Sequence, residues 1–212
     1  MTTKINIACV GDSITNGHGA TDLTTESYPA RLQVLLGNEY LVENFGVNAM
    51  TVLNNTETPY TRTEKYFNSI ASNADIVILM LGTNDAKLAN WARNEQNFRK
   101  DFKQLILQYK EMSSKPIVFI ATSPTAWRNY GVLNDNTIIP EIVDEKVVVI
   151  QKEMAEELDC MIIDIHEKTK DMKEYFPDTI HPNSDGYEKI ASFMYEGIKS
   201  DCLSLRLNKS AL

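Results

Sequence analysis

Short apolar runs alternate along the chain with longer segments in which apolar residues recur every three or four positions. The runs are rich in branched side chains and are typical of buried strands; they cover residues 5–10, 40–47, 74–81, 116–121 and 160–165. The helical periodicity covers residues 27–36, 66–72, 98–112, 141–158 and 184–199. Two polar segments, residues 48–63 and 123–140, are predicted to be loops.

This regular alternation of strand and helix predicts an α/β fold with a parallel sheet, right-handed crossovers and helices on both faces. The run at residues 74–81 is almost continuously apolar, as expected of a strand that is covered on both faces. The chain contains no internal repeat and no linker-like stretch. We therefore expect residues 1–212 to form one doubly wound domain with about five strands and the first strand at the centre.

Composition narrows the class of protein. The 212 residues are 43% hydrophobic and 24% charged, as in ordinary soluble globular proteins. The net charge of −8 argues against nucleic acid or an anionic membrane surface as a partner. No apolar run reaches membrane-spanning length, and residues 1–4 lead directly into the first strand without a signal peptide, so we expect a cytoplasmic protein. The three cysteines are widely spaced, which favours reduced thiols.

The end of the first strand carries the first candidate for chemistry, the turn Gly11-Asp12-Ser13. In open α/β sheets, ligands bind at the carboxyl ends of the strands. A serine hydroxyl is a weak nucleophile unless a base removes its proton and hydrogen-bond donors hold the developing oxyanion. The turn therefore requires a histidine paired with a carboxylate, together with such donors.

Other strand ends supply these groups. Asp178 precedes His181 by three residues, a spacing at which one turn can present the carboxylate to imidazole Nδ1 and leave Nε2 for the serine. Gly46 offers an unobstructed backbone N–H, and Asn84 a side-chain amide. Because the carboxyl ends of parallel strands share one edge, these residues are expected to converge on Ser13.

Together, these motifs resemble the four sequence blocks of the SGNH (GDSL) hydrolase superfamily, in the family's order. The resemblance implies a flavodoxin-like three-layer α/β/α sandwich and ester hydrolysis without a cofactor or metal. It also implies a role for each residue: Ser13 as nucleophile and, through its N–H, an oxyanion donor; Gly46 and Asn84 as the other two donors; His181 as the base; and Asp178 as the carboxylate that orients it.

The segments 26–29 and 82–87, with Trp91, look most like the carbohydrate acetylesterase branch. We therefore predict a serine esterase that removes small acyl groups, acetyl first, from a small-molecule ester such as an acylated sugar. A lysophospholipase or thioesterase of the same superfamily is the first alternative. A second is a metal-dependent phosphoesterase, and a third is a non-catalytic carbohydrate-binding module. The phosphoesterase would use the acidic and imidazole groups of Asp12, Asp85, Asp178 and His181.

Several further residues have ordinary structural explanations. Asp12 and Asp85 are expected to brace turns through hydrogen bonds. His18 is expected to be a solvated loop residue, with a position lining the pocket as the alternative, and His166 a surface residue. Cys9 is expected to be a small buried apolar residue. Four aromatic residues could either stack on a substrate or pack in the interior: Tyr28, Trp91, Trp127 and Tyr130.

Overall fold

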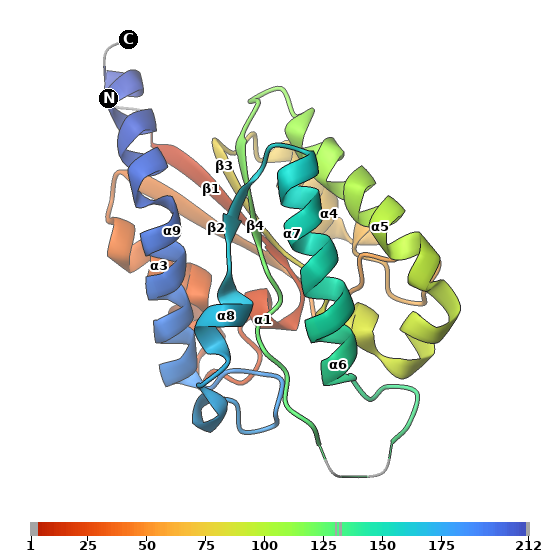
Figure 1. Ribbon diagram of the computed structural model, residues 1–212. Helices are drawn as coiled ribbons and strands as arrows, with labels where there is room; N and C mark the ends of the chain where they lie inside the picture. Colours follow the sequence, from red (N-terminus) through yellow and green to blue (C-terminus); the bar gives the residue numbers. More distant parts are fainter. Residues whose placement is uncertain (1–3, 130, 132, 211–212) are drawn as a thin grey trace.

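The computed structural model describes residues 4–129, 131 and 133–210, which form a three-layer α/β/α sandwich around a parallel sheet (Figure 1). The five strands stand in the order β2-β1-β3-β4-β5. Their bounds are β1 Ile5–Gly11, β2 Tyr40–Gly46, β3 Ile76–Met80, β4 Ile117–Ala121 and β5 Met161–Ile163. The flavodoxin-like order is confirmed. The expectation that the first strand is central is wrong: β3 is the middle strand, because only β2 lies on the outer side of β1.

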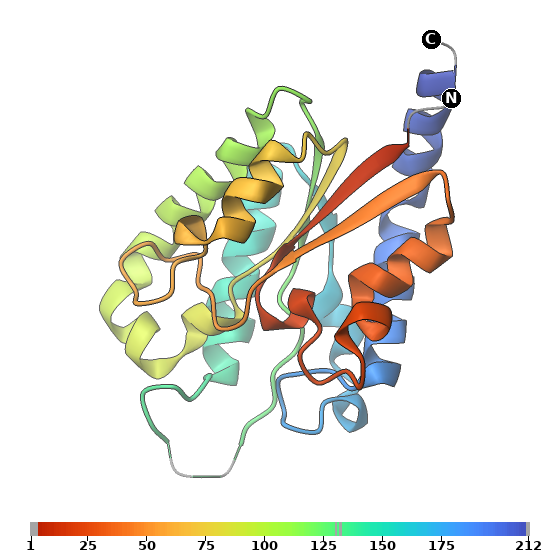
Figure 2. The ribbon, with the colours of Figure 1, turned by 180° about the vertical axis from the view of Figure 1, so that it is seen from behind.

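The helices divide between the two faces of the sheet, as Figures 1 and 2 show together. One face is covered by α3 (Tyr28–Leu36) and α9 (Ser184–Ser210); the other by α4 (Glu64–Ala71), α5 (Leu88–Lys110) and α7 (Val148–Glu157). Shorter helical pieces connect them: α1 Ser13–Asn16, α2 Leu23–Glu26, η1 Tyr60–Arg62, η2 Thr83–Ala86, α6 Pro140–Ile142, η3 Val143–Val147, α8 Ile165–Thr169 and η4 Lys173–Tyr175.

Alternation along the strands builds two cores from one sheet. In β3, Val77 and Leu79 face the core under α4, α5 and α7, whereas Ile76 and Ile78 face the core under α3 and α9. All four side chains are fully buried. The continuous apolar run is therefore the mark of a strand that is covered on both faces.

Two helices are longer than the periodicity predicts. The prediction of 98–112 omits the first turns of α5, whose backbone N–H groups at Leu88 and Ala89 are bound by the carbonyls of Thr137 and Asp135. The prediction also ends α9 at residue 199, although the helix continues to Ser210 and buries Cys202 against the sheet. In both cases contacts with distant segments extend a helix beyond its local signal.

The predicted helix over 141–158 is helical to Glu157 and contains a π-helical turn, η3, between α6 and α7. Within the described part of the chain, no helix combines the length and the hydropathy needed to cross a membrane.

Candidate active site

A serine, a histidine and an aspartate lie in hydrogen-bonded sequence at the carboxyl edge of the sheet. Ser13 Oγ lies 2.9 Å from His181 Nε2, and His181 Nδ1 lies 2.6 Å from Asp178 Oδ2. An ionised carboxylate can only accept, so Asp178 takes the Nδ1–H and leaves the Nε2 lone pair for the serine proton. The arrangement can pass a proton from Ser13 to His181.

Local backbone structure holds Ser13 in place. It is the first residue of α1, and Asp12 caps that helix by accepting a hydrogen bond from the Ile14 N–H at 3.0 Å. The first N–H groups of a helix have no intrahelical acceptor, so the Ser13 N–H is a suitable oxyanion donor. Gly46 allows α1 to approach β2, since a Cβ at Gly46 would lie 2.2 Å from the Asn16 nitrogen. The expected turn-bracing role of Asp12 is confirmed.

The carboxylate of Asp178 is fixed as an anion. Burial raises the pKa of Asp178, but hydrogen bonds from the His181 ring and from the backbone N–H groups of His181 and Ile180 outweigh it, and the net shift is downward. The two N–H groups bind the same oxygen, Oδ1, at 2.6 Å and 2.9 Å. The other oxygen is thereby aimed at the imidazole.

The two other expected oxyanion donors lie in different settings. Asn84 is the second residue of η2, is 5% exposed, lines the cavity and donates a long hydrogen bond of 3.5 Å to Asp12 Oδ2. The Gly46 N–H is donated to Asn44 Oδ1 at 2.8 Å, and Gly46 is not among the cavity-lining residues that the structure describes. The Asn84 amide lines the cavity and has two N–H donors, of which the long bond to Asp12 uses one, so it can also donate to a ligand. The single N–H of Gly46 already has an acceptor.

Asp85 is buried directly behind this site. Its two carboxylate oxygens accept hydrogen bonds from the N–H groups of Val52 and Leu53, at 3.0 Å and 2.9 Å. Burial raises the pKa of Asp85 to about 7, against the lowering effect of these two bonds. Burial likewise raises the pKa of Asp12 to about 6. The expected bracing role of Asp85 is confirmed.

The triad opens into a cavity of about 500 Å³. Its lining combines polar groups with apolar ones. Amide, hydroxyl, indole and ammonium groups come from Asn48, Lys87, Trp127, Asn129, Asn134, Asn136 and Thr137, and apolar groups from Ala49, Ile138 and Ile180. Of the four aromatic candidates, Trp127 lines this cavity, and Tyr28 and Trp91 are core residues at 0% and 5% exposure. Tyr130 lies outside the described residues.

His18 and His166, for which no catalytic role is expected, lie in different environments. His18 is exposed, as expected, and it also lines the cavity beside His181, the alternative expected for this residue. The expectation for His166 is wrong. Its side chain is only 17% exposed, and its Nε2 lies 3.4 Å from Asp144 Oδ1, because α8 packs that ring against η3.

Sequence reasoning missed residues that support the site from behind. Asn44 joins β2 to α1 by donating to the Thr15 carbonyl at 2.9 Å while accepting from the Gly46 N–H. Gln151, fully buried in α7, donates to the Leu81 carbonyl and accepts from the Ser123 N–H, which ties the ends of β3 and β4 together. No local pattern marks either residue, because each acts on strands distant in sequence.

Comparisons with known proteins found a matching family model and a similar sequence. The family model described as the GDSL-like Lipase/Acylhydrolase family matches residues 9–189. An acetylxylan esterase from Xylanibacter ruminicola is 33% identical over 92% of this chain. The chain spans only 43% of that relative's length.

Solved structures share the fold. A carbohydrate acetylesterase family member from Sinorhizobium meliloti superposes with a TM-score of 0.70 at 19% identity, covering 96% of this chain and 99% of that one. The native aryl esterase of M. smegmatis superposes with a TM-score of 0.72 at 18% identity, covering 92% and 98%. At such identities the likeness establishes the three-layer fold.

Proposed function

The chain belongs to the GDSL-like lipase/acylhydrolase family, and from that premise we propose that it is a serine esterase that removes acetyl groups from a carbohydrate. The observation that carries the proposal is the hydrogen-bonded sequence from Ser13 through His181 to Asp178, with spacings of 2.9 Å and 2.6 Å, at the wall of a cavity. The acetylxylan esterase relative supports the acetyl group and the sugar.

In this mechanism the Ser13 Oγ attacks the ester carbonyl carbon while His181 Nε2 takes the hydroxyl proton. The carbonyl oxygen becomes an oxyanion, held by the Ser13 N–H and the Asn84 amide. The Gly46 N–H is already donated to Asn44 Oδ1, so it contributes when the oxyanion either displaces that oxygen or shares the N–H with it. Collapse of the intermediate breaks the bond to the leaving alcohol, which takes the proton from His181.

Water then attacks the acyl group on Ser13 as His181 accepts a proton again. The second intermediate releases the carboxylic acid and restores the serine hydroxyl. Asp178 stays ionised throughout and stabilises the imidazolium that forms in each half of the reaction.

The lining of the cavity supports a sugar as the alcohol. Amide and hydroxyl groups can exchange hydrogen bonds with sugar hydroxyls, and the Trp127 indole offers an apolar face to a sugar ring. A long acyl chain would instead need a continuous apolar wall.

The metal-dependent phosphoesterase has less support. It needs Asp12, Asp85, Asp178 and His181 to act on one ion. Asp12 and Asp85 are each engaged with backbone N–H groups. In the described part of the chain, the histidine and carboxylate atoms that gather closely enough to share an ion come from His18, Asp178 and His181.

The test compares p-nitrophenyl acetate, butyrate and octanoate, and measures acetate release from acetylated xylooligosaccharides. We expect kcat/KM to be highest for the acetyl ester, acetate to be released from the oligosaccharide, and Ser13→Ala to lose on the order of 10⁴ or more in kcat. Ser72→Ala, which removes a serine outside the cavity, is the matched control and should keep wild-type activity.

Each alternative has its own signature. Preference for the octanoate ester would indicate a lysophospholipase or thioesterase. Ester hydrolysis that persists in the presence of a chelator would exclude the metal-dependent phosphoesterase, and activity that disappears would indicate a metal-dependent enzyme. A wild-type protein whose Ser13 does not react with a fluorophosphonate probe, detected by peptide mass spectrometry, would indicate a carbohydrate-binding module.

A further inference from the structure

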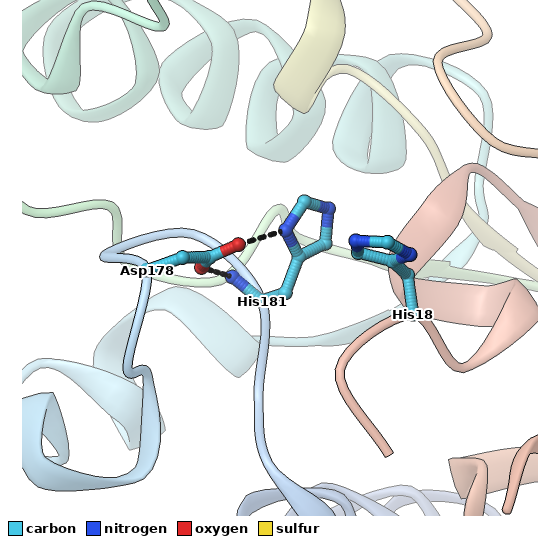
Figure 3. Close-up of side chains that lie close together, drawn as sticks. All are labelled: His18, Asp178 and His181. Atoms are coloured by element: carbon cyan, nitrogen blue, oxygen red, sulfur yellow. Dashed lines mark hydrogen bonds and ion pairs between the residues drawn. The ribbon is translucent and has the colours of Figure 1, made fainter. Parts of the chain in front are cut away.

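A second histidine, which the proposed mechanism does not use, lies against the proposed base. The rings of His18 and His181 meet edge to face, with 4.4 Å between centroids and 70° between planes (Figure 3). Asp178 lies on the other side of His181. One candidate ligand atom from each of His18, Asp178 and His181 lies within 4.8 Å of the other two.

The fold itself places His18 there. Gly17 and Gly19 flank it with positive φ values of 102° and 98°, a conformation that favours glycine. The hydroxyl of fully buried Tyr187 donates to the His18 carbonyl at 2.7 Å. A Cβ at Gly19 would lie 2.5 Å from the Pro182 carbonyl oxygen, so the loop packs directly on the chain that carries His181.

Two imidazoles and one carboxylate, open to solvent on one side, form a ligand set typical of Zn²⁺ with an open coordination position. Tetrahedral zinc with ligands at about 2.0–2.1 Å brings the ligand atoms to roughly 3.3 Å from one another. The His18 side chain is exposed and the Asp178 side chain is 52% exposed, so rotation of these two groups can close the set around an ion.

We infer that His18, Asp178 and His181 form a binding site for Zn²⁺ and that the bound ion blocks the esterase site. An ion held by all three residues binds His181 at Nδ1, the nitrogen that faces Asp178, and takes the place of that hydrogen bond. The neutral imidazole then carries its proton on Nε2, so Nε2 can no longer accept the proton of Ser13. The binding rests on geometry alone; only the inhibition rests on the proposed function.

The binding arm uses a protein that cannot turn over substrate. Zinc is titrated into Ser13→Ala by calorimetry, and the imidazole resonances are followed by NMR. We expect one ion per chain and shifted His18 and His181 signals. His18→Phe, introduced into the Ser13→Ala protein, keeps a ring but removes both nitrogens, and it should weaken zinc binding by about tenfold or more. Residues that only hydrogen-bond to metal ligands already contribute about tenfold to 100-fold to metal affinity.

His166→Asn is the matched control. It removes the remaining one of the chain's three histidines, one that is also paired with an aspartate but does not line the cavity. Zinc affinity should stay at the level of Ser13→Ala. Mg²⁺, which prefers all-oxygen sites, should produce no comparable heat.

The inhibition arm measures hydrolysis of p-nitrophenyl acetate by the wild-type protein and by His18→Phe, each relative to its own zinc-free rate. We expect zinc to inhibit the wild type, a chelator to restore the rate, and His18→Phe to need about tenfold or more zinc for the same fractional inhibition.

Zinc that fails to bind Ser13→Ala saturably, or that binds equally well after His18→Phe, would overturn the inference. A protein that binds zinc as described but hydrolyses no ester would refute the proposed function and leave the metal site standing.

Discussion

Three aspartates near the cavity have different electrostatic settings although their side chains are identical. Asp178 receives hydrogen bonds from two N–H groups and an imidazole, which overcome burial and lower its pKa. Asp12 and Asp85 are buried more deeply, and desolvation raises their pKa values to about 6 and about 7. Residue type alone therefore does not assign the orienting carboxylate; the number of donors and the depth of burial do.

At the same scale, the oxyanion assignment of Asn84 makes a prediction. Asn84→Ala removes the one side-chain donor of the proposed site, so kcat for p-nitrophenyl acetate should fall by about 10²–10³. KM should change little, because the interaction strengthens as the oxyanion forms. Asn136→Ala, which removes another amide of the cavity wall, is the control and should leave kcat within a few-fold. Equal losses in both variants would contradict the assignment.

At the scale of elements, buried carboxylates hold a polar loop in place by accepting hydrogen bonds from its backbone N–H groups. The segment between β2 and α4 has the composition of a loop, but Asp85 binds the N–H groups of Val52 and Leu53, and Asp101 binds that of Asn54. Asp85 directly follows Asn84, so the same turn that carries the proposed amide donor also holds this loop.

This anchor predicts a pH-dependent stability. An asparagine amide nitrogen cannot accept one of the two N–H groups, so Asp85→Asn should lower the free energy of unfolding by about 1–3 kcal/mol at pH 5. Burial raises the pKa of Asp85 from 3.8 to about 7 in the folded protein, so the folded state binds more protons than the unfolded state across this interval. The carboxyl group's contribution to stability is therefore full below pH 3.8 and is lost progressively as the pH rises from 3.8 through 7, so it is larger at pH 5 than at pH 8.

Urea unfolding at pH 5 and pH 8 measures this effect. The loss of unfolding free energy caused by Asp85→Asn should be smaller at pH 8 than at pH 5. Asp101→Asn, which removes the neighbouring anchor of the same loop, controls for loosening of the loop. A loss that grows with pH would refute the assignment of a raised pKa to Asp85.

At the scale of the whole molecule, the two cores depend on the same strands. Successive residues of β3 enter opposite cores, so neither core can form without the sheet that also builds the other. Trp91 packs on Phe98 in one core, and Trp127 packs on Phe176 at the other. The two tryptophans therefore report on opposite layers.

We propose on this basis that residues 1–212 fold as a single domain. Trp91→Phe and Trp127→Phe leave one tryptophan each, and within each variant the urea midpoint from fluorescence should coincide with that from far-UV circular dichroism. A fluorescence transition that clearly precedes the loss of secondary structure in either variant would show that its layer unfolds separately.

Local sequence was sufficient for the order of strands and helices and for most of the proposed site. Apolar periodicity depends on neighbouring residues, so it located the five strands and the main helices. The spacing of Asp178 and His181 lies within one turn, and the structure brings both to Ser13, as expected of residues that follow the ends of parallel strands. The sequence did not predict the first turns of α5 or the last turns of α9, because these helix bounds depend on tertiary contacts.

Only the tertiary structure decided how groups distant in the chain affect one another. It placed the His18 ring against His181, with the His18 carbonyl held by the Tyr187 hydroxyl. It also paired the Gly46 N–H with Asn44 Oδ1. It also divided the aspartates into those with raised and lowered pKa values. A periodic pattern records which face of its own element a residue occupies; desolvation and hydrogen bonding depend on the elements packed against that face, and these are fixed only when the layers close.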